Sequence, residues 1–167
     1  MIDKDLFIAE NARVVATPGP NWTFGLLQSN WIDFRVATDW ARGSAVCANF
    51  RISSLFNNQA GNLLRFAVVV DGNSSFSNVN STPELLLARS HDLTSAMLSN
   101  AANLGAVVPV ALPPYGDLLR GLGEGFRYLT LGVQFLVPTT DWTQGGIDAF
   151  FAPQPLPARP LSVPSGF

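Results

Sequence analysis

One segment of the sequence, residues 63–90, has the pattern of two strands joined by a long surface connection. Its first part, LLRFAVVVDG, and its last part, ELLLARS, are rich in β-branched and aliphatic residues. Between them lies NSSFSNVNSTP, a polar stretch with the single aromatic residue Phe76. Apolar runs bounded by turn-forming residues are typical of strands, so this segment predicts part of a β-sandwich. It offers no reactive chemistry, and we expect it to act as a scaffold.

Short apolar runs separated by chain breakers extend over most of the sequence. Strands are predicted at residues 31–37, 46–53, 63–71, 84–90, 106–112, 126–137 and 146–152. Gly132, inside one of them, is expected to form a β-bulge. Residues 91–104 have roughly helical spacing and predict one or two helical turns. This many short strands predicts an all-β fold, an antiparallel β-sandwich or jelly roll.

The two ends of the chain depart from this pattern. Residues 1–30 are expected to be irregular and partly extended, because prolines bracket a glycine in the TPGPN turn at 17–21. The last segment, 153–167, reads PQPLPARPLSVPSGF, and proline at this density favours an extended arm. We therefore predict a β-sandwich domain over 1–152 and a Pro-rich arm over 153–167. The arm is either a disordered tail or a segment ordered by a neighbouring molecule.

The composition predicts a surface that is poor in charge. Charged residues make up 13% of the chain, against a globular average of about 25%. Such a surface suits a protein that packs against others, although uncharged loops on an ordinary β-protein would give the same composition. The net charge of −2 argues against nonspecific nucleic-acid binding. No apolar run is long enough to cross a bilayer, and the acidic N-terminus is unlike a signal peptide, so we expect a protein made in a cytoplasm.

The residues do not indicate a reaction centre, a cofactor or a metal site. His91 and Cys47 are the only residues of their types, too few for a zinc site, and Cys47 is interpreted as a small buried hydrophobe. The GLGEG run at 121–125 lacks the lysine of a phosphate loop. Asp33 and Asp148 could form an acid/base pair only if the fold brought them together, and strand carboxylates usually face solvent. We therefore expect a protein that is not an enzyme.

Tryptophan gives the main alternative. A sugar-stacking platform could be formed by the four tryptophans, Trp22, Trp31, Trp40 and Trp142. Trp142 lies in a predicted loop, TTDWTQGG, where such a platform would be placed. Tryptophans are more often part of cores or protein interfaces. A carbohydrate-binding β-sandwich module that uses exposed tryptophans therefore remains the second hypothesis.

The order of several short motifs resembles the capsid cement, or decoration, proteins of tailed bacteriophages. The motifs are MIDKDLF at 1–7, FAVVV, SSFSN and LLLARS within 66–90, VALPP at 110–114, RYLTL at 127–131 and GGIDAFF at 145–151. Together they span nearly the whole chain, although each is short. The chain departs from the family pattern in a longer, Trp-rich segment at 19–44 and in its Pro-rich tail.

The resemblance implies a jelly-roll subunit that clamps neighbouring major capsid proteins on the outside of the phage head. It implies self-association as a homodimer rather than a trimer, a location on the virion surface after synthesis in the host cytoplasm, and no catalysis, cofactor, nucleic-acid or membrane contact. Modest interfaces can suffice for this, because contacts to several shell proteins act together. The candidate protein-contact residues are Leu6, Phe7, Trp22, Trp142, Leu156, Arg159, Leu161, Val163 and Phe167.

Overall fold

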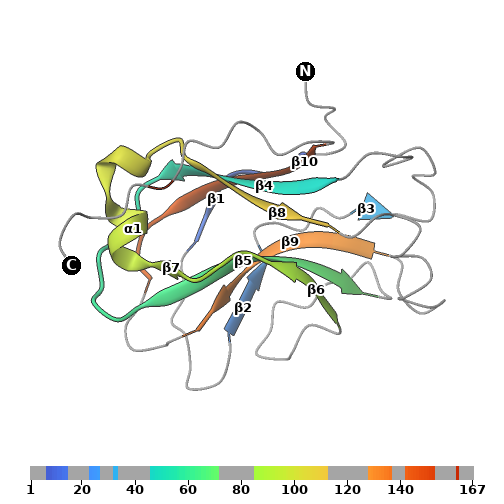
Figure 1. Ribbon diagram of the computed structural model, residues 1–167, viewed down its shortest axis with the longest axis horizontal. Helices are drawn as coiled ribbons and strands as arrows, with labels where there is room; N and C mark the ends of the chain where they lie inside the picture. Colours follow the sequence, from blue (N-terminus) through green and yellow to red (C-terminus); the bar gives the residue numbers. More distant parts are fainter. Residues whose placement is uncertain are drawn as a thin grey trace.

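Nearly all regular structure in this protein is β-strand, and the strands form two antiparallel sheets that face each other (Figure 1). The computed structural model describes residues 7–14, 23–26, 32–33, 46–71, 85–112, 128–136, 142–152 and 161. The prediction of an all-β, antiparallel fold is therefore confirmed. The jelly-roll connectivity stays a prediction.

The first sheet has four strands, of which β10 and β4 are central. In spatial order the strands are β1 (Phe7–Arg13), β10 (Gly146–Ala152), β4 (Cys47–Ser54) and β8 (Val107–Ala111). The pairing of β4 with β8 keeps one register from Cys47↔Ala111 to Arg51↔Val107. The pairing of β1 with β10 shifts register twice, so β1 is an irregular edge strand.

The second sheet has six strands built around the pair β5–β9. Its strands are β2 (Thr23–Leu26), β9 (Tyr128–Phe135), β5 (Leu63–Asp71) and β6 (Leu85–Arg89), with the short strands β3 (Ile32–Asp33) on β9 and β7 (Leu93–Thr94) on β5. The register of β5 and β9 is continuous through Gly132. The expected bulge at Gly132 is therefore wrong. Gly132 is an ordinary ladder residue opposite Ala67.

The predicted strands from residue 46 onward agree with the observed strands to within about two residues. Strand β3, Ile32–Asp33, lies within the predicted strand at 31–37, and the other residues of that range lie outside the described residues. The structure adds β1 and β2 within the segment that was expected to be irregular. In β1, Asn11 has a φ of 45°. This conformation interrupts the two-residue alternation by which a strand is recognised in sequence.

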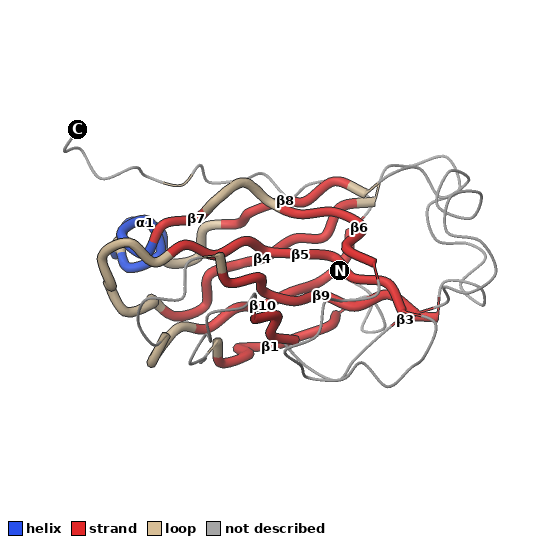
Figure 2. The backbone as a smooth tube through the Cα atoms, turned by 90° about the horizontal axis from the view of Figure 1, so that it is seen from below, coloured by secondary structure: helices blue, strands red, loops and turns tan. Residues whose placement is uncertain are grey.

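A short helix follows β7, as expected for residues 91–104. Helix α1 (Ser95–Ser99) is capped by the hydroxyl of Thr94, which accepts a hydrogen bond from the Met97 amide at 3.2 Å. A 3-10 turn, Ala101–Asn103, comes next, and the Asn100 side chain caps it. Figure 2 shows α1 at one end of the two sheets, beside the loops that join the strands there.

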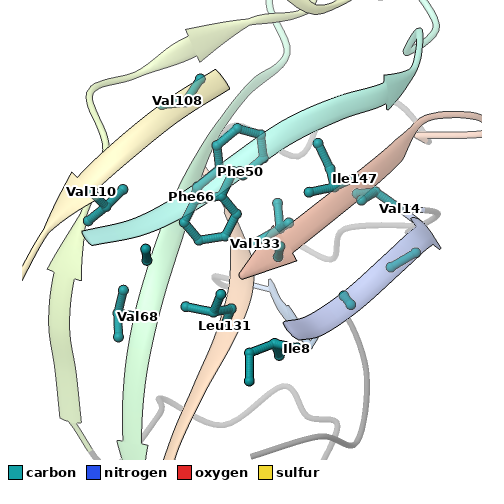
Figure 3. Packing of buried hydrophobic residues seen from close by; sticks show 14 of the residues in the cluster. Ile8, Val14, Phe50, Phe66, Val68, Val108, Val110, Leu131, Val133 and Ile147 are labelled. Carbon is teal, nitrogen blue, oxygen red and sulfur yellow. The ribbon is translucent and has the colours of Figure 1, made fainter. Parts of the chain in front are cut away.

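The core lies between the sheets, where inward-facing side chains of β4 and β10 meet those of β5 and β9 (Figure 3). At its centre the rings of Phe50 and Phe66, one from each sheet, stack with centroids 4.7 Å apart. Both residues are fully buried. Burial of a phenylalanine contributes about 1.5–3 kcal/mol, and a stacked pair adds about 1 kcal/mol. This contact is therefore one of those that hold the two sheets together.

Several side chains on the faces away from this core are also buried. Alternation places Phe150 and Asn49 on the far face of the four-stranded sheet, and Val69 and Thr130 on the far face of the other. All four are nearly inaccessible to solvent. Strands that are buried on both faces read as continuous apolar runs, which explains sequences such as FAVVV and AFFA.

Candidate contact surface

Trp142 lies in the core, which corrects its expected position as a loop-exposed contact or sugar-stacking residue. Its side chain is fully buried. The ring meets Phe56 edge-on at 5.6 Å and Phe135 at a tilt at 6.3 Å. Polar turn residues flank Trp142 in the sequence and suggest an exposed loop, but its side chain turns inward between two phenylalanines. The most favourable candidate for a sugar platform is therefore absent from the surface.

Of the other predicted contact residues, the structure describes Phe7 and Leu161. Leu6, Trp22, Leu156, Arg159, Val163 and Phe167 lie outside the described residues. Phe7 begins β1, where its backbone is opposite Phe150. Leu161 is half-buried and packs against the core cluster of its own chain. The one described residue of the Pro-rich segment thus has an intramolecular contact, whereas it was expected to anchor the segment on a neighbour.

Asp148 is a structural residue and does not face solvent as expected. Its side chain is 7% exposed. One carboxylate oxygen accepts a hydrogen bond from the Asn11 amide at 2.7 Å, and the other accepts from Arg51 Nε at 2.8 Å. The carboxylate therefore joins β1, β10 and β4. Asp33 belongs to the other sheet, on β3, so the strands do not place the two carboxylates side by side in one sheet.

The remaining reactive residues are also engaged or isolated. The Ser90 hydroxyl accepts a hydrogen bond from the Phe66 amide and donates to the His91 carbonyl, so it supports the chain bend next to β5. His91 is exposed, and the neighbouring Asp92 pairs with Arg65. Cys47 is buried, as predicted, and burial raises the pKa of its thiol.

No group of three or more histidine, cysteine, aspartate or glutamate side chains in the described part of the chain is placed to hold a metal ion. No helix among the same residues is long and apolar enough to cross a membrane.

Three described segments that meet at one end of the two-sheet structure contain no charged residue of their own, and the Arg13 guanidinium borders them by donating to the Thr143 carbonyl at 3.2 Å. This uncharged end consists of residues 52–62, 95–106 and 142–147, and none of them is Asp, Glu, Lys, Arg or His. It includes α1 and the loops beside it (Figures 1 and 2). The average composition of the chain, 13% charged, would place about four charged residues there. In the sequence, the sign of this uncharged end is two long runs without charged residues. Only the fold shows that these runs lie next to each other.

Two backbone–backbone hydrogen bonds and one bond to a side chain join the three segments of the uncharged end. The Phe56 amide donates to the Leu98 carbonyl at 3.2 Å, and the Gly105 amide donates to the Ile52 carbonyl at 2.8 Å. The Asn57 side-chain oxygen accepts from the Thr143 amide at 3.1 Å. These bonds link residues that are far apart in the sequence, so the end is one ordered unit rather than three independent loops.

The polar side chains of this end serve its own backbone. Asn103 Nδ2 donates to the Met97 carbonyl at 2.8 Å, and the Ser95 hydroxyl donates to the Gln59 carbonyl at 2.6 Å. The exposed residues of this end are small, apolar or uncharged polar ones, namely Ser54, Asn58, Ala60, Gly61, Ala101, Ala102, Leu104, Gly105, Thr143 and Gln144. Leu104 is 50% exposed and is the one large hydrophobic side chain among the described residues that is classed as exposed.

The uncharged end can therefore make contacts by shape and apolar burial, with little electrostatic contribution. Recognition of a sugar would need amide and hydroxyl groups directed outward, and here several of them are directed inward. A protein partner with a neutral surface would leave no charge buried without a partner.

No family model matches the chain, and neither does any curated protein or solved structure.

Proposed function

We propose that this protein is a non-catalytic structural subunit, a capsid decoration protein that attaches to the outside of a tailed-phage head. The motif order of the sequence is the basis for the family. The proposed mode of action, attachment to the shell through a neutral surface, rests on one observation, the uncharged end with Leu104 exposed at its surface. Its partner is the major capsid protein, and the subunit also associates with itself as a dimer on the virion surface.

The geometry supports attachment by a rigid, neutral surface. The loops of the uncharged end are held by the bonds from Asn57, Ser95 and Asn103, so little conformational entropy is lost when a partner binds. Apolar contacts around Leu104 need no charged partner. A single contact of this kind is weak, but many subunits on one shell, each touching more than one shell protein, give firm attachment.

The carbohydrate-binding alternative is not favoured. It depended on exposed tryptophans, and Trp142, the best-placed of them in the sequence, is fully buried. The contribution of the Pro-rich segment also changes, because Leu161 packs against its own chain. We therefore place the principal shell contact at the uncharged end.

The test is co-sedimentation with undecorated heads of the phage that encodes the chain. Leu104→Asp places a charge in the middle of the proposed contact and is expected to weaken binding by about tenfold or more. Ala111→Asp is the matched control, because it adds the same charge at an exposed residue of β8 outside the uncharged end. It is expected to bind like the unmodified protein.

Salt provides a second readout in the same assay. An apolar contact is expected to change little between low and high ionic strength, whereas an ion-paired one weakens. Heads that retain Leu104→Asp as well as the unmodified protein would remove the uncharged end from the proposal. The absence of any binding by the unmodified protein, together with retention on a glycan array, would replace the proposed function by the carbohydrate alternative.

A further inference from the structure

Strand β8 forms an outer edge of the four-stranded sheet. Two hydrogen bonds, one just beyond each end of β8, show which of its residues direct their backbone groups toward β4. The Leu112 amide donates to the Val46 carbonyl at 2.9 Å, and the Ile52 amide donates to the Ala106 carbonyl at 3.0 Å. The register between these bonds is unbroken, so every second residue from 106 to 112 directs its backbone groups toward β4.

The intervening residues are Val107, Pro109 and Ala111. Their backbone groups point away from β4, toward the side on which none of the described strands pairs with β8. Val107 and Ala111 each present an amide and a carbonyl there. Pro109 is the middle residue of the three and presents only a carbonyl, because its ring occupies the position of the amide hydrogen. Pro109 and Ala111 are exposed to solvent.

Strand β8 carries no charged residue of its own. The sequence has no charged residue between Asp92 and Asp117, and β8 itself reads VVPVA, with three valines. An uncharged, β-branched edge strand is a template for pairing with another chain. Strand β1, at the opposite edge, has two register shifts and the charged residues Glu10 and Arg13. Proline is the one protective device that β8 contains.

We propose that Pro109 keeps a second copy of this chain from pairing with β8. In an antiparallel β8–β8 pair centred on residue 109, Val107 would lie opposite Ala111 of the second copy, and the two prolines would face each other. The central pair would lose both of its hydrogen bonds. The two rings would also prevent the strands from approaching to the usual spacing of about 4.8 Å. This inference does not rest on the proposed function, since it concerns only the edge of the sheet.

The experiment compares Pro109→Val with Ala111→Val by analytical ultracentrifugation. Pro109→Val restores the central amide and is expected to lower the dissociation constant for additional self-association by about tenfold or more, because two hydrogen bonds are regained. Ala111→Val adds apolar volume on the same strand but no amide, so it is expected to behave like the unmodified protein. Pro109→Lys restores the amide together with a charge and is also expected to show no added association.

Hydrogen exchange identifies the interface. The new amide at position 109 is expected to exchange rapidly at low concentration and to become protected as the Pro109→Val protein associates. Pro109→Thr, a less apolar variant, is measured in parallel in case the valine variant precipitates. If both variants fold and sediment as the unmodified protein does, the inference is wrong. It is also wrong if Ala111→Val associates to the same extent, because apolar volume would then be the cause.

Discussion

Gly145 lies immediately before β10, and it is the glycine whose replacement we expect to destabilise the structure most. Its φ is +145°, a conformation that residues with a side chain rarely adopt. A Cβ atom at this position would lie 2.5 Å from Cδ1 of the Phe56 ring. That ring is 1% exposed and packs edge-on against Trp142, so it has little room to move away. Gly145→Ala therefore combines backbone strain with overpacking.

The two costs can be estimated separately. A residue other than glycine in this backbone region costs about 1–3 kcal/mol. Forcing a methyl group into a packed core costs about 1–3 kcal/mol more. We expect the free energy of unfolding to fall by about 4 kcal/mol in total, which for a domain of this size lowers the melting temperature by about 10 °C.

Gly61→Ala is the matched control. Gly61 also has a positive φ, +86°, but a Cβ atom there would meet no other atom within 4 Å. It therefore carries the backbone strain alone, about 1 kcal/mol, part of which is offset by the lower entropy of the unfolded chain. Urea denaturation of both variants gives the difference. Equal losses of stability in the two variants would refute the contact between position 145 and the Phe56 ring.

Two further predictions concern the four-stranded sheet. Arg51→Met leaves the buried Asp148 carboxylate with one fewer partner, and because the arginine side chain is 54% exposed we expect a loss of about 1–2 kcal/mol in urea denaturation. Arg51→Met combined with Asp148→Asn, which removes the charge but keeps an oxygen to accept from the Asn11 amide, should recover part of this loss, and a double variant that is less stable than the sum of its parts would contradict the pairing. The buried Cys47 thiol, whose pKa is raised by burial, should react with a thiol reagent at pH 8 only after unfolding. Rapid reaction in the folded protein would show that it is accessible.

The sequence predicts best where local pattern and burial agree. Strand β5 and strand β10 are long runs of β-branched and apolar residues between turn signals, and they lie where the sequence places them. Strand β1 was missed because its ladder shifts register at two points and Asn11 has a positive φ. A bulged strand has no constant two-residue period, so no local pattern marks it.

Side-chain direction is harder to predict than strand position. Trp142 follows a polar, turn-like sequence, yet its ring is enclosed by Phe135 at the end of β9 and by Phe56, which is far from it in the chain. Asp148 alternates to the face away from the core, as its strand requires, but Arg51 and the Asn11 amide meet it there. In both cases tertiary contacts decide the exposure. They depend on which strands become neighbours, and the sequence of one strand does not contain that information.

The run without charged residues between Asp92 and Asp117, which includes Leu104 of the uncharged end and all of β8, has two opposing physical consequences. It allows close contact with a neutral partner around Leu104, but it also leaves the β8 edge without electrostatic protection against self-pairing. Because amides such as that of Asn103 are directed inward, contact with a neutral partner is mainly apolar. Pro109 limits self-pairing at the β8 edge. The two roles are separable. Leu104→Asp should weaken attachment by about tenfold or more without changing self-association, whereas Pro109→Val should change self-association while the contact at Leu104 remains intact. A variant at either position that altered both properties together would show that one surface serves both.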